Sequence, residues 1–172
     1  FYVNVNSHLV DEVGLKPGQK IVDLACGTGQ VTRMIAEKVT GTKDSIVIGM
    51  DASSVALKEA MAHLSSVKDT AIQFIQSQIE QFSVSVKDSV DAVLLCNAIH
   101  YISDKDDLIT QVGKRLKTGG LFAFNTSFYS GSHPPSTEEF YRKWMFKALR
   151  ILKTQYDLRP IKTEKVQSRV TL

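Results

Sequence analysis

The sequence predicts an α/β protein with three layers, in which a mostly parallel sheet is covered by helices on both faces. Two observations predict this fold class. Short apolar segments alternate along the chain with longer segments of helical periodicity. Several of the short segments are apolar at successive positions, which is typical of parallel strands buried on both faces. The chain has 172 residues, 43% of them hydrophobic, and this size fits one domain with its own core.

Five strands are predicted from the apolar segments, at residues 20–25, 45–51, 71–76, 90–97 and 121–126. The helical segments lie at about 4–13, 30–40, 54–64 and 104–116. We expect the first helix to end near Gly14, because Pro17 follows closely. We expect Ser103 to open the helix at 104–116, with Asp106 as in a capping box, and KTGG at 117–120 to end it. Since ligands of parallel sheets bind beyond the carboxyl ends of the strands, the residues after each strand are the site candidates.

The last part of the chain differs in charge from the rest. Residues 1–140 hold 12 Lys and Arg against 16 Asp and Glu, a net charge of −4. Residues 141–172 hold 9 against 2, a net charge of +7. We therefore expect a ligand-binding core over residues 1–130, followed by a basic helical lid or insertion segment over residues 131–172.

Three elements are predicted within that segment and just before it. The run SFYSGSHPPS at 127–136 is typical of a loop, because it is rich in Gly, Pro and Ser. Residues from about 137 to 155 are typical of an amphipathic helix with an apolar stripe around Trp144. This stripe indicates either packing or a cover for an apolar substrate. Residues 165–172 alternate as in a short strand.

The run IVDLACGTGQ at 21–30 predicts a ligand cradle. Gly27 and Gly29 lack a Cβ atom, so they tolerate a sharp turn and let a ligand approach the backbone. A strand, a glycine turn and a helix N-terminus together suit a polar ligand. Asp51 ends the next strand, 22 residues after Gly29, where an acid can accept hydrogen bonds from ribose hydroxyls. Thr32 replaces the third glycine of the dinucleotide fingerprint, and no phosphate-loop motif is present.

At this point the residues resemble a known family. VDLACGTGQ is similar to motif I of the class I S-adenosylmethionine-dependent methyltransferases, usually D-x-G-x-G-x-G, and GMDAS at 49–53 resembles their second motif. The similarity continues, in the family's order and spacing, with FIQSQIEQF at 74–82, VDAVLLCNAIHYISD at 90–104 and LKTGGLFAF at 116–124. It covers about residues 5–127 and is greatest to the small-molecule branch. The resemblance implies a Rossmann-like fold and S-adenosylmethionine as the cofactor.

The resemblance also implies a role for individual residues. Asp23 is expected near the methionine ammonium, Asp51 at the ribose hydroxyls and Gln78 at the adenine edge, where the family often has aspartate. Ala25 stands where many members have a glycine. The full set of residues expected at the cofactor is Tyr2, Asp23, Ala25, Cys26, Gly27, Thr28, Gly29, Asp51, Ala52, Gln78, Ile79, Asn97 and Ala98.

Methyl transfer mainly requires that the donor and the acceptor are aligned and desolvated, which can lower the barrier by about 7–11 kcal/mol. A general base is needed only where the acceptor loses a proton, and His100, beside Tyr101, is the best-placed candidate. For His100 we also retain the alternative of a hydrogen-bonded residue that shapes the pocket, and for Asp23 that of a helix cap. Cys26 is interpreted as an apolar filler.

Three functional hypotheses remain open from the sequence. The first is a methyltransferase of small molecules, with no metal, since no carboxylate cluster demands one. The second is a methyltransferase of RNA or another polyanion that uses the basic segment, although the acceptor motif N-P-P-[YF] is replaced by Asn97-Ala98-Ile99-His100. The third is a non-catalytic cofactor-binding module or a domain embedded in a synthase.

Two further expectations concern the setting of the chain. No apolar run approaches the ~20 residues of a membrane span, and two cysteines 70 residues apart indicate a reducing cytoplasm. The family's sheet normally ends in two more strands, which cannot both be placed in 128–172. We therefore expect a fold that is incomplete at the C-terminal end or a piece of a longer protein.

Overall fold

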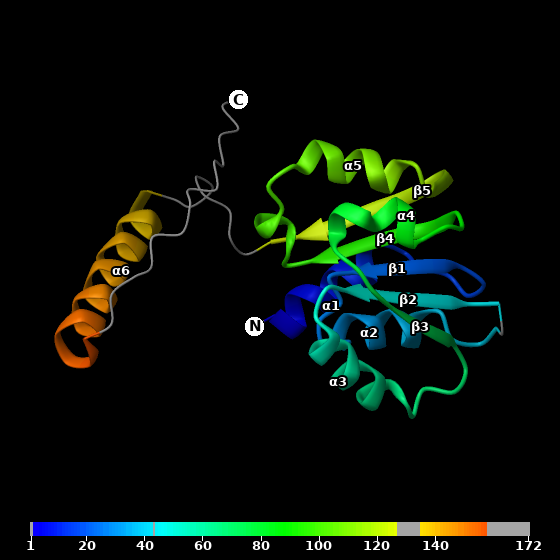
Figure 1. The fold of residues 1–172 in the computed structure, drawn as a ribbon, viewed down its shortest axis with the longest axis horizontal. Coiled ribbons are helices and arrows are strands. Elements are labelled where there is room, and N and C mark those ends of the chain that lie inside the picture. Colours follow the sequence, from blue (N-terminus) through cyan, green and yellow to red (C-terminus); the bar gives the residue numbers. More distant parts are fainter. Residues whose placement is uncertain (1, 43, 127–134, 158–172) are drawn as a thin grey trace. The chain divides into compact units, whose positions relative to one another are not determined.

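The computed structural model describes residues 2–42, 44–126 and 135–157. Its contacts divide the chain into two compact units, Phe1–Ser127 and Phe128–Leu172. The first unit holds a sheet with helices against both of its faces (Figure 1). This architecture confirms the α/β fold class predicted from the sequence.

The sheet consists of β1 (Lys20–Leu24), β2 (Ile46–Asp51), β3 (Ala71–Gln76), β4 (Val90–Cys96) and β5 (Leu116–Asn125). The strands are all parallel and follow the order β3-β2-β1-β4-β5. The central strand β1 places Asp23 opposite Gly49 of β2 on one side and Leu94 of β4 on the other. The chain therefore changes its direction of travel across the sheet between β1 and β4, which is where such sheets form their ligand crevice.

The helices of this unit are α1 (Tyr2–Glu12), α2 (Gln30–Lys38), α3 (Ser54–Leu64), α4 (Phe82–Ser85) and α5 (Lys105–Gly113), with 3₁₀ turns η1 (Ile79–Gln81) and η2 (Ile99–Tyr101). The sequence pattern did not predict η1, α4 or η2, because each is shorter than the window over which helical periodicity is readable. Gly14 follows α1 with a positive φ of 67°, so the predicted end of that helix is correct.

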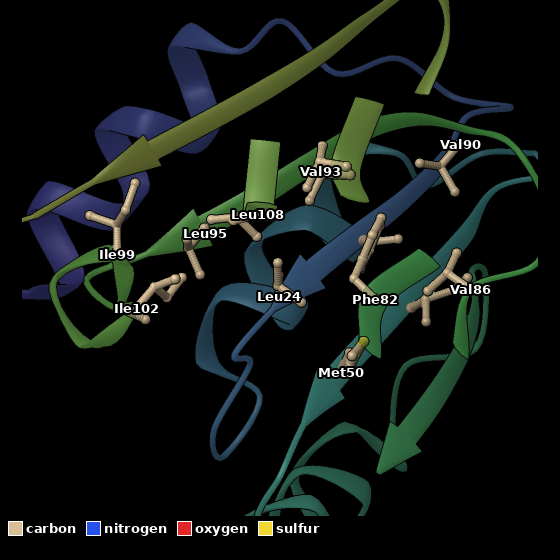
Figure 2. Packing of buried hydrophobic residues seen from close by; sticks show 14 residues of the cluster. Leu24, Met50, Phe82, Val86, Val90, Val93, Leu95, Ile99, Ile102 and Leu108 are labelled. Carbon is tan, nitrogen blue, oxygen red and sulfur yellow. The ribbon is translucent and has the colours of Figure 1, made fainter. Parts of the chain in front are cut away.

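Two apolar clusters fill the space between the sheet and its helices. One lies on the face of α1 and α2 and contains Val10, Ile35, Val47 and Leu94, all at most 1% exposed. The other lies on the face of α4 and α5 (Figure 2), and its labelled members are Leu24, Met50, Phe82, Val86, Val90, Val93, Leu95, Ile99, Ile102 and Leu108. Because strands β1, β2 and β4 contribute side chains to both clusters, their sequences are apolar at successive positions.

The segment KTGG does not end α5 as expected but lies within β5. Helix α5 ends at Gly113, and β5 already begins at Leu116. The register jumps from Val90↔Leu116 to Ala92↔Leu121, so residues 117–120 form a bulge opposite a single residue of β4. Gly119 has a φ of +77°, which explains the glycine. The glycines do allow an irregular backbone at 117–120, but this irregularity lies inside β5 and does not separate it from α5.

The start of α5 also differs from the prediction. Asp104, rather than Ser103, caps the helix, and its Oδ1 accepts a hydrogen bond from the Asp107 N–H at 2.9 Å. A carboxylate at this position satisfies a free amide of the first turn and opposes the positive end of the helix dipole.

The second unit is described through α6 (Pro135–Tyr156), which begins and ends close to the predicted bounds of 137–155. Large apolar side chains are exposed along it, among them Phe140, Trp144, Met145 and Phe146. None of the helices in the described ranges has the length and apolar character that crossing a membrane requires. The strand predicted at 165–172 and most of the loop predicted at 127–136 lie outside the described residues.

The short helix α4 offers a matched test of the core. Phe82 is fully buried, whereas Val84, two residues on in the same helix, is 72% exposed. We expect Phe82→Ala to lower the free energy of unfolding by about 3–5 kcal/mol, because it leaves a cavity in the packed cluster. We expect Val84→Ala to change it by less than about 0.5 kcal/mol. Urea denaturation measures both, and equal losses would contradict the described packing.

Candidate functional site

The glycine turn after β1 has a backbone with several residues in the left-handed region of φ. Ala25, Gly27 and Gly29 all have positive φ, at 59°, 52° and 84°. A non-glycine residue in this region is uncommon, so the position of Ala25 favours glycine even though alanine occupies it here. The Gly29 N–H donates to the Cys26 carbonyl at 3.0 Å and closes the turn. Helix α2 then begins at Gln30, and its N-cap residue, Gly29, has no side chain with which to cap the first amides.

Gly29 is required by packing as well as by its φ. A Cβ atom at this position would lie 2.7 Å from Leu64 Cδ1 and 3.0 Å from Ala60 Cβ of α3. The backbone of the turn at Gly29 therefore packs directly against α3. At Gly27, in contrast, a Cβ atom would meet nothing within 4 Å.

Asp51, at the end of β2, ties the two strand ends together. Its Oδ2 accepts a hydrogen bond from the Gly27 N–H at 2.9 Å, and its Oδ1 accepts one from the Ser53 N–H at 2.8 Å. These two bonds fix the carboxylate plane beside the glycine turn. Each carboxylate oxygen has a second lone pair, so Asp51 can still accept hydrogen bonds from a ligand.

Asp23 is the most deeply buried acid of the site, with only 1% of its surface exposed. The Thr32 Oγ1 donates to its Oδ2 at 2.6 Å. Burial, with a smaller contribution from nearby Asp51, raises the pKa of Asp23 from 3.8 to about 7, against the opposing effect of the Thr32 hydrogen bond. Thr32, which the sequence offered only as a missing glycine, is thus the partner of this acid.

The end of β4 forms the opposite wall. Asn97 has a positive φ of 53°, and its N–H donates to both the backbone carbonyl and the side-chain Oδ1 of Asn125, at 3.0 and 2.8 Å. The turn η2 then carries His100 and Tyr101, whose ring centroids lie 4.1 Å apart. His100 Nδ1 lies 3.1 Å from Thr126 Oγ1. Burial, with a smaller effect of Lys105, lowers the pKa of His100 below its usual value of 6.5.

These strand ends surround a cavity of about 430 Å³, here called the strand-end cavity. Ten of the residues expected at the cofactor or in catalysis line it, namely Tyr2, Asp23, Ala25, Cys26, Gly27, Thr28, Asp51, Asn97, Ala98 and Tyr101. Five expected residues are not among its lining residues, namely Gly29, Ala52, Gln78, Ile79 and His100. Gln78 and Ile79 lie at η1, beyond β3, and Ala52 follows β2 directly.

Four lining residues had no role assigned to them from the sequence, namely Asn6, Gln30, Val31 and Cys96. Gln30 and Val31 form the first turn of α2, and Cys96 is the last residue of β4. Gln30 already lies among the site candidates that follow β1, and the rule that ligands bind at strand ends, extended by one residue, also includes Val31 and Cys96. Asn6 lies on α1, and no local signal in the sequence assigns it to this cavity.

The charges of the strand-end cavity favour a cationic ligand. Two acids, Asp23 and Asp51, line it, and none of its described lining residues is Lys, Arg or His. Burial raises the pKa of the Cys26 and Cys96 thiols to about 12, so neither sulfur is a thiolate near pH 7. Within the described ranges, no group of three or more His, Cys, Asp or Glu is arranged to hold a metal ion. The site suits a ligand with positive charge and hydroxyl groups.

The raised pKa of Asp23 predicts a pH-dependent cost of folding. Between about pH 4 and 7 the folded state keeps a proton on Asp23 that the unfolded state has lost, so the stability contribution of this group falls as pH rises through this range and is constant above it. Asp23→Asn removes this dependence. We expect the stability of Asp23→Asn relative to wild type to rise by about 2–3 kcal/mol between pH 5 and 8, as measured by urea denaturation. A difference that does not change with pH would contradict the prediction.

Comparisons with known proteins agree with this geometry. A family model described as "Methyltransferase domain" matches residues 21–120. The "Phosphoethanolamine N-methyltransferase 1" of Triticum aestivum is 32% identical over 158 residues, which are 90% of this chain and 28% of that protein. The "Ubiquinone biosynthesis O-methyltransferase" of Vibrio atlanticus (strain LGP32) is 28% identical over 109 residues, 63% of this chain and 44% of that protein.

A solved structure has a similar fold. The structure of an S-adenosylmethionine-dependent methyltransferase from Clostridium acetobutylicum ATCC 824 has a TM-score of 0.57 and 26% identity, and the match covers 73% of this chain and 49% of that one. The chain spans less than half the length of each of these relatives. The family model covers more than half of the chain, from β1 into β5. The chain therefore belongs to the class I S-adenosylmethionine-dependent methyltransferases.

Proposed function

We propose that this chain binds S-adenosylmethionine in the strand-end cavity and transfers its methyl group to a small-molecule acceptor. One observation carries the proposal. The cavity combines a glycine turn of positive φ with two carboxyl groups, Asp23 and Asp51, and has no cation among its described lining residues. S-adenosylmethionine has a ribose diol and two positive groups, the sulfonium and the ammonium, so the residues present fit it.

Different residues would contact different parts of the cofactor. Asp51, held by the Gly27 and Ser53 amides, would accept hydrogen bonds from the ribose hydroxyls. Asp23 would face the ammonium, whose positive charge favours the ionised form of this carboxyl. The remaining proposed contacts are the backbone of Ala25, Cys26, Gly27, Thr28 and Gly29, the adenine side with Ala52, Gln78 and Ile79, the methionine side with Asn97 and Ala98, and Tyr2 as a cover.

Catalysis then depends on alignment and exclusion of water. When bound, the cofactor supplies an electrophilic methyl group on a positively charged sulfur. The chain holds the reacting groups in line and removes solvent, which is worth about 7–11 kcal/mol where alignment is good. His100 would take a proton from an acceptor that must lose one. Because its pKa is lowered, the imidazole is unprotonated near pH 7 and can therefore accept a proton.

A small-molecule acceptor is supported by the names of the relatives, which refer to phosphoethanolamine and to ubiquinone biosynthesis. We further propose, from the charge and periodicity of the sequence, that residues 131–172 serve as a helical lid or insertion segment. Free thiols at Cys26 and Cys96 support a reducing, cytoplasmic setting.

RNA or another polyanion is a second candidate acceptor. The observation that favours it is the set of exposed basic side chains on α6, namely Arg142, Lys143, Lys147, Arg150 and Lys153. Such side chains neutralise phosphates without reading sequence. The position of the label after methyl transfer, in low-mass metabolites or in RNA, distinguishes the two acceptors.

Cofactor binding is tested at Asp51. We expect Asp51→Asn to weaken the binding of S-adenosylhomocysteine by about ten- to a hundredfold, because hydrogen bonds to a charged acceptor are lost. The matched control is Asp69→Asn, which removes an equal charge from an exposed position outside the cavity. Isothermal titration calorimetry measures both dissociation constants. If Asp51→Asn binds the ligand as tightly as the control does, the proposed ribose contact is wrong.

The role of His100 is tested by activity. The wild-type chain is incubated with S-adenosylmethionine labelled in its methyl group and with cell extract, and labelled products are identified by mass spectrometry. For an acceptor that loses a proton, we expect His100→Ala to lower kcat about 10²- to 10⁴-fold while the affinity for S-adenosylhomocysteine is retained. In wild type the acid limb of the rate profile should lie below pH 6.5, since the pKa of His100 is lowered.

Two outcomes would contradict these roles. Unchanged kcat in His100→Ala would show that this side chain shapes the pocket without moving a proton. Tight cofactor binding without any labelled product would favour the non-catalytic module over the enzyme.

A further inference from the structure

Helix α1 reaches the strand-end cavity through its first turns, and these turns are little buried. Residues 2–5 are all exposed, and Tyr2, although 43% exposed, lines the cavity. Asn6 is the first buried residue within the described part of the chain, with 7% of its surface exposed, and it also lines the cavity. Asn6 therefore anchors the first turns of α1 beside the cavity.

Asn6 is held by a residue that is distant from it in the sequence. The Asn125 Nδ2, at the end of β5, donates a hydrogen bond to the Asn6 Oδ1 at 3.0 Å, across 119 residues of chain. The other end of the same amide, Asn125 Oδ1, accepts from the Asn97 N–H at 2.8 Å. One planar side chain thus joins α1 to the backbone after β4, and both of its partners line the cavity.

The other anchors of α1 lie toward its C-terminal end. Val10 is 1% exposed and packs in the cluster with α2. Asp11 Oδ1 lies 2.5 Å from Lys38 Nζ, also of α2. These contacts secure the second half of the helix, and the Asn6–Asn125 bond ties its first half to the sheet.

We propose that Asn6, Asn125 and Asn97 form an asparagine relay, in which Asn125 positions both the opening turns of α1 and the backbone of Asn97 around the cofactor. The inference rests on the proposed function for its ligand, but not for its structural part. Asn6 and Asn125 are positioning residues, and they act through Tyr2 on one side and Asn97 on the other.

The chemistry of an amide makes the relay specific. An asparagine offers a donor and an acceptor from one plane, so it can bridge a carbonyl oxygen and a backbone N–H at once. Asn97 is held in a left-handed conformation that most residues avoid, and the bond to Asn125 Oδ1 supports it there. Loss of Asn6 leaves the half-buried Asn125 Nδ2 without its acceptor, which is costlier than loss of both partners together.

The structural part is tested by amide hydrogen exchange in the free protein. We expect Asn6→Leu to speed exchange in the first half of α1 about tenfold, as the loss of one partly buried hydrogen bond predicts. The control Asn4→Leu, at an exposed position of the same helix, should leave it unchanged. The double variant Asn6→Leu/Asn125→Leu should be no less stable to urea than the worse of the single variants. Equal exchange in Asn6→Leu and Asn4→Leu, or strictly additive losses of stability, would overturn the relay.

The functional part is tested by titration with S-adenosylhomocysteine. We expect Asn6→Leu and Asn125→Leu each to raise the dissociation constant about three- to tenfold, and to raise the KM for S-adenosylmethionine more than they change kcat. Unchanged affinity together with faster exchange of α1 would overturn the coupling of the relay to the cavity. If the wild-type chain binds no S-adenosylhomocysteine, the proposed function fails, and the exchange measurement alone decides whether the relay holds α1.

Discussion

The hydrogen bond from the Gly27 N–H to Asp51, at 2.9 Å, is the contact on which the rest of the site depends. It joins the glycine turn after the central strand β1 to the end of its neighbour β2. A turn with three positive φ values has little intrinsic stability, so it needs such a tie on one side and the packing of Gly29 against α3 on the other. The ligand surface is therefore built before any ligand arrives.

The two acids of the cavity differ because their surroundings differ. Asp51 lies at the rim, where two backbone amides satisfy it. Asp23 is enclosed, with the Thr32 hydroxyl as its hydrogen-bond partner, and its pKa rises to about 7. A buried acid without a cation is a cost to folding that a cationic ligand can offset. On this account, part of the stability given up by the free protein returns as affinity for an ammonium or sulfonium group.

Periodicity and motif spacing predicted the strands, their alternation with helices, and the cluster of acids and glycines at the strand ends. Their success has a physical cause, since β1, β2 and β4 are buried on both faces and carry continuous apolar runs. Long-range and irregular features were not predictable. No feature of the sequence near Asn6 or Asn125 indicates that their side chains form a hydrogen bond. A glycine pair such as that in KTGG is equally compatible with a turn that ends a helix and with the bulge in β5. The partnership of Thr32 with Asp23 likewise appears only when β1 and α2 are packed.

We propose that a nucleoside with a positively charged sulfur lies across residues 25–29 with its ribose on Asp51. A crystal structure of the chain in complex with S-adenosylhomocysteine, the product that retains the same nucleoside, would test this placement. We expect density in the strand-end cavity, with both ribose hydroxyls within hydrogen-bonding distance of the Asp51 carboxylate. A nucleoside bound elsewhere, or one in this cavity with its ribose turned away from Asp51, would contradict it.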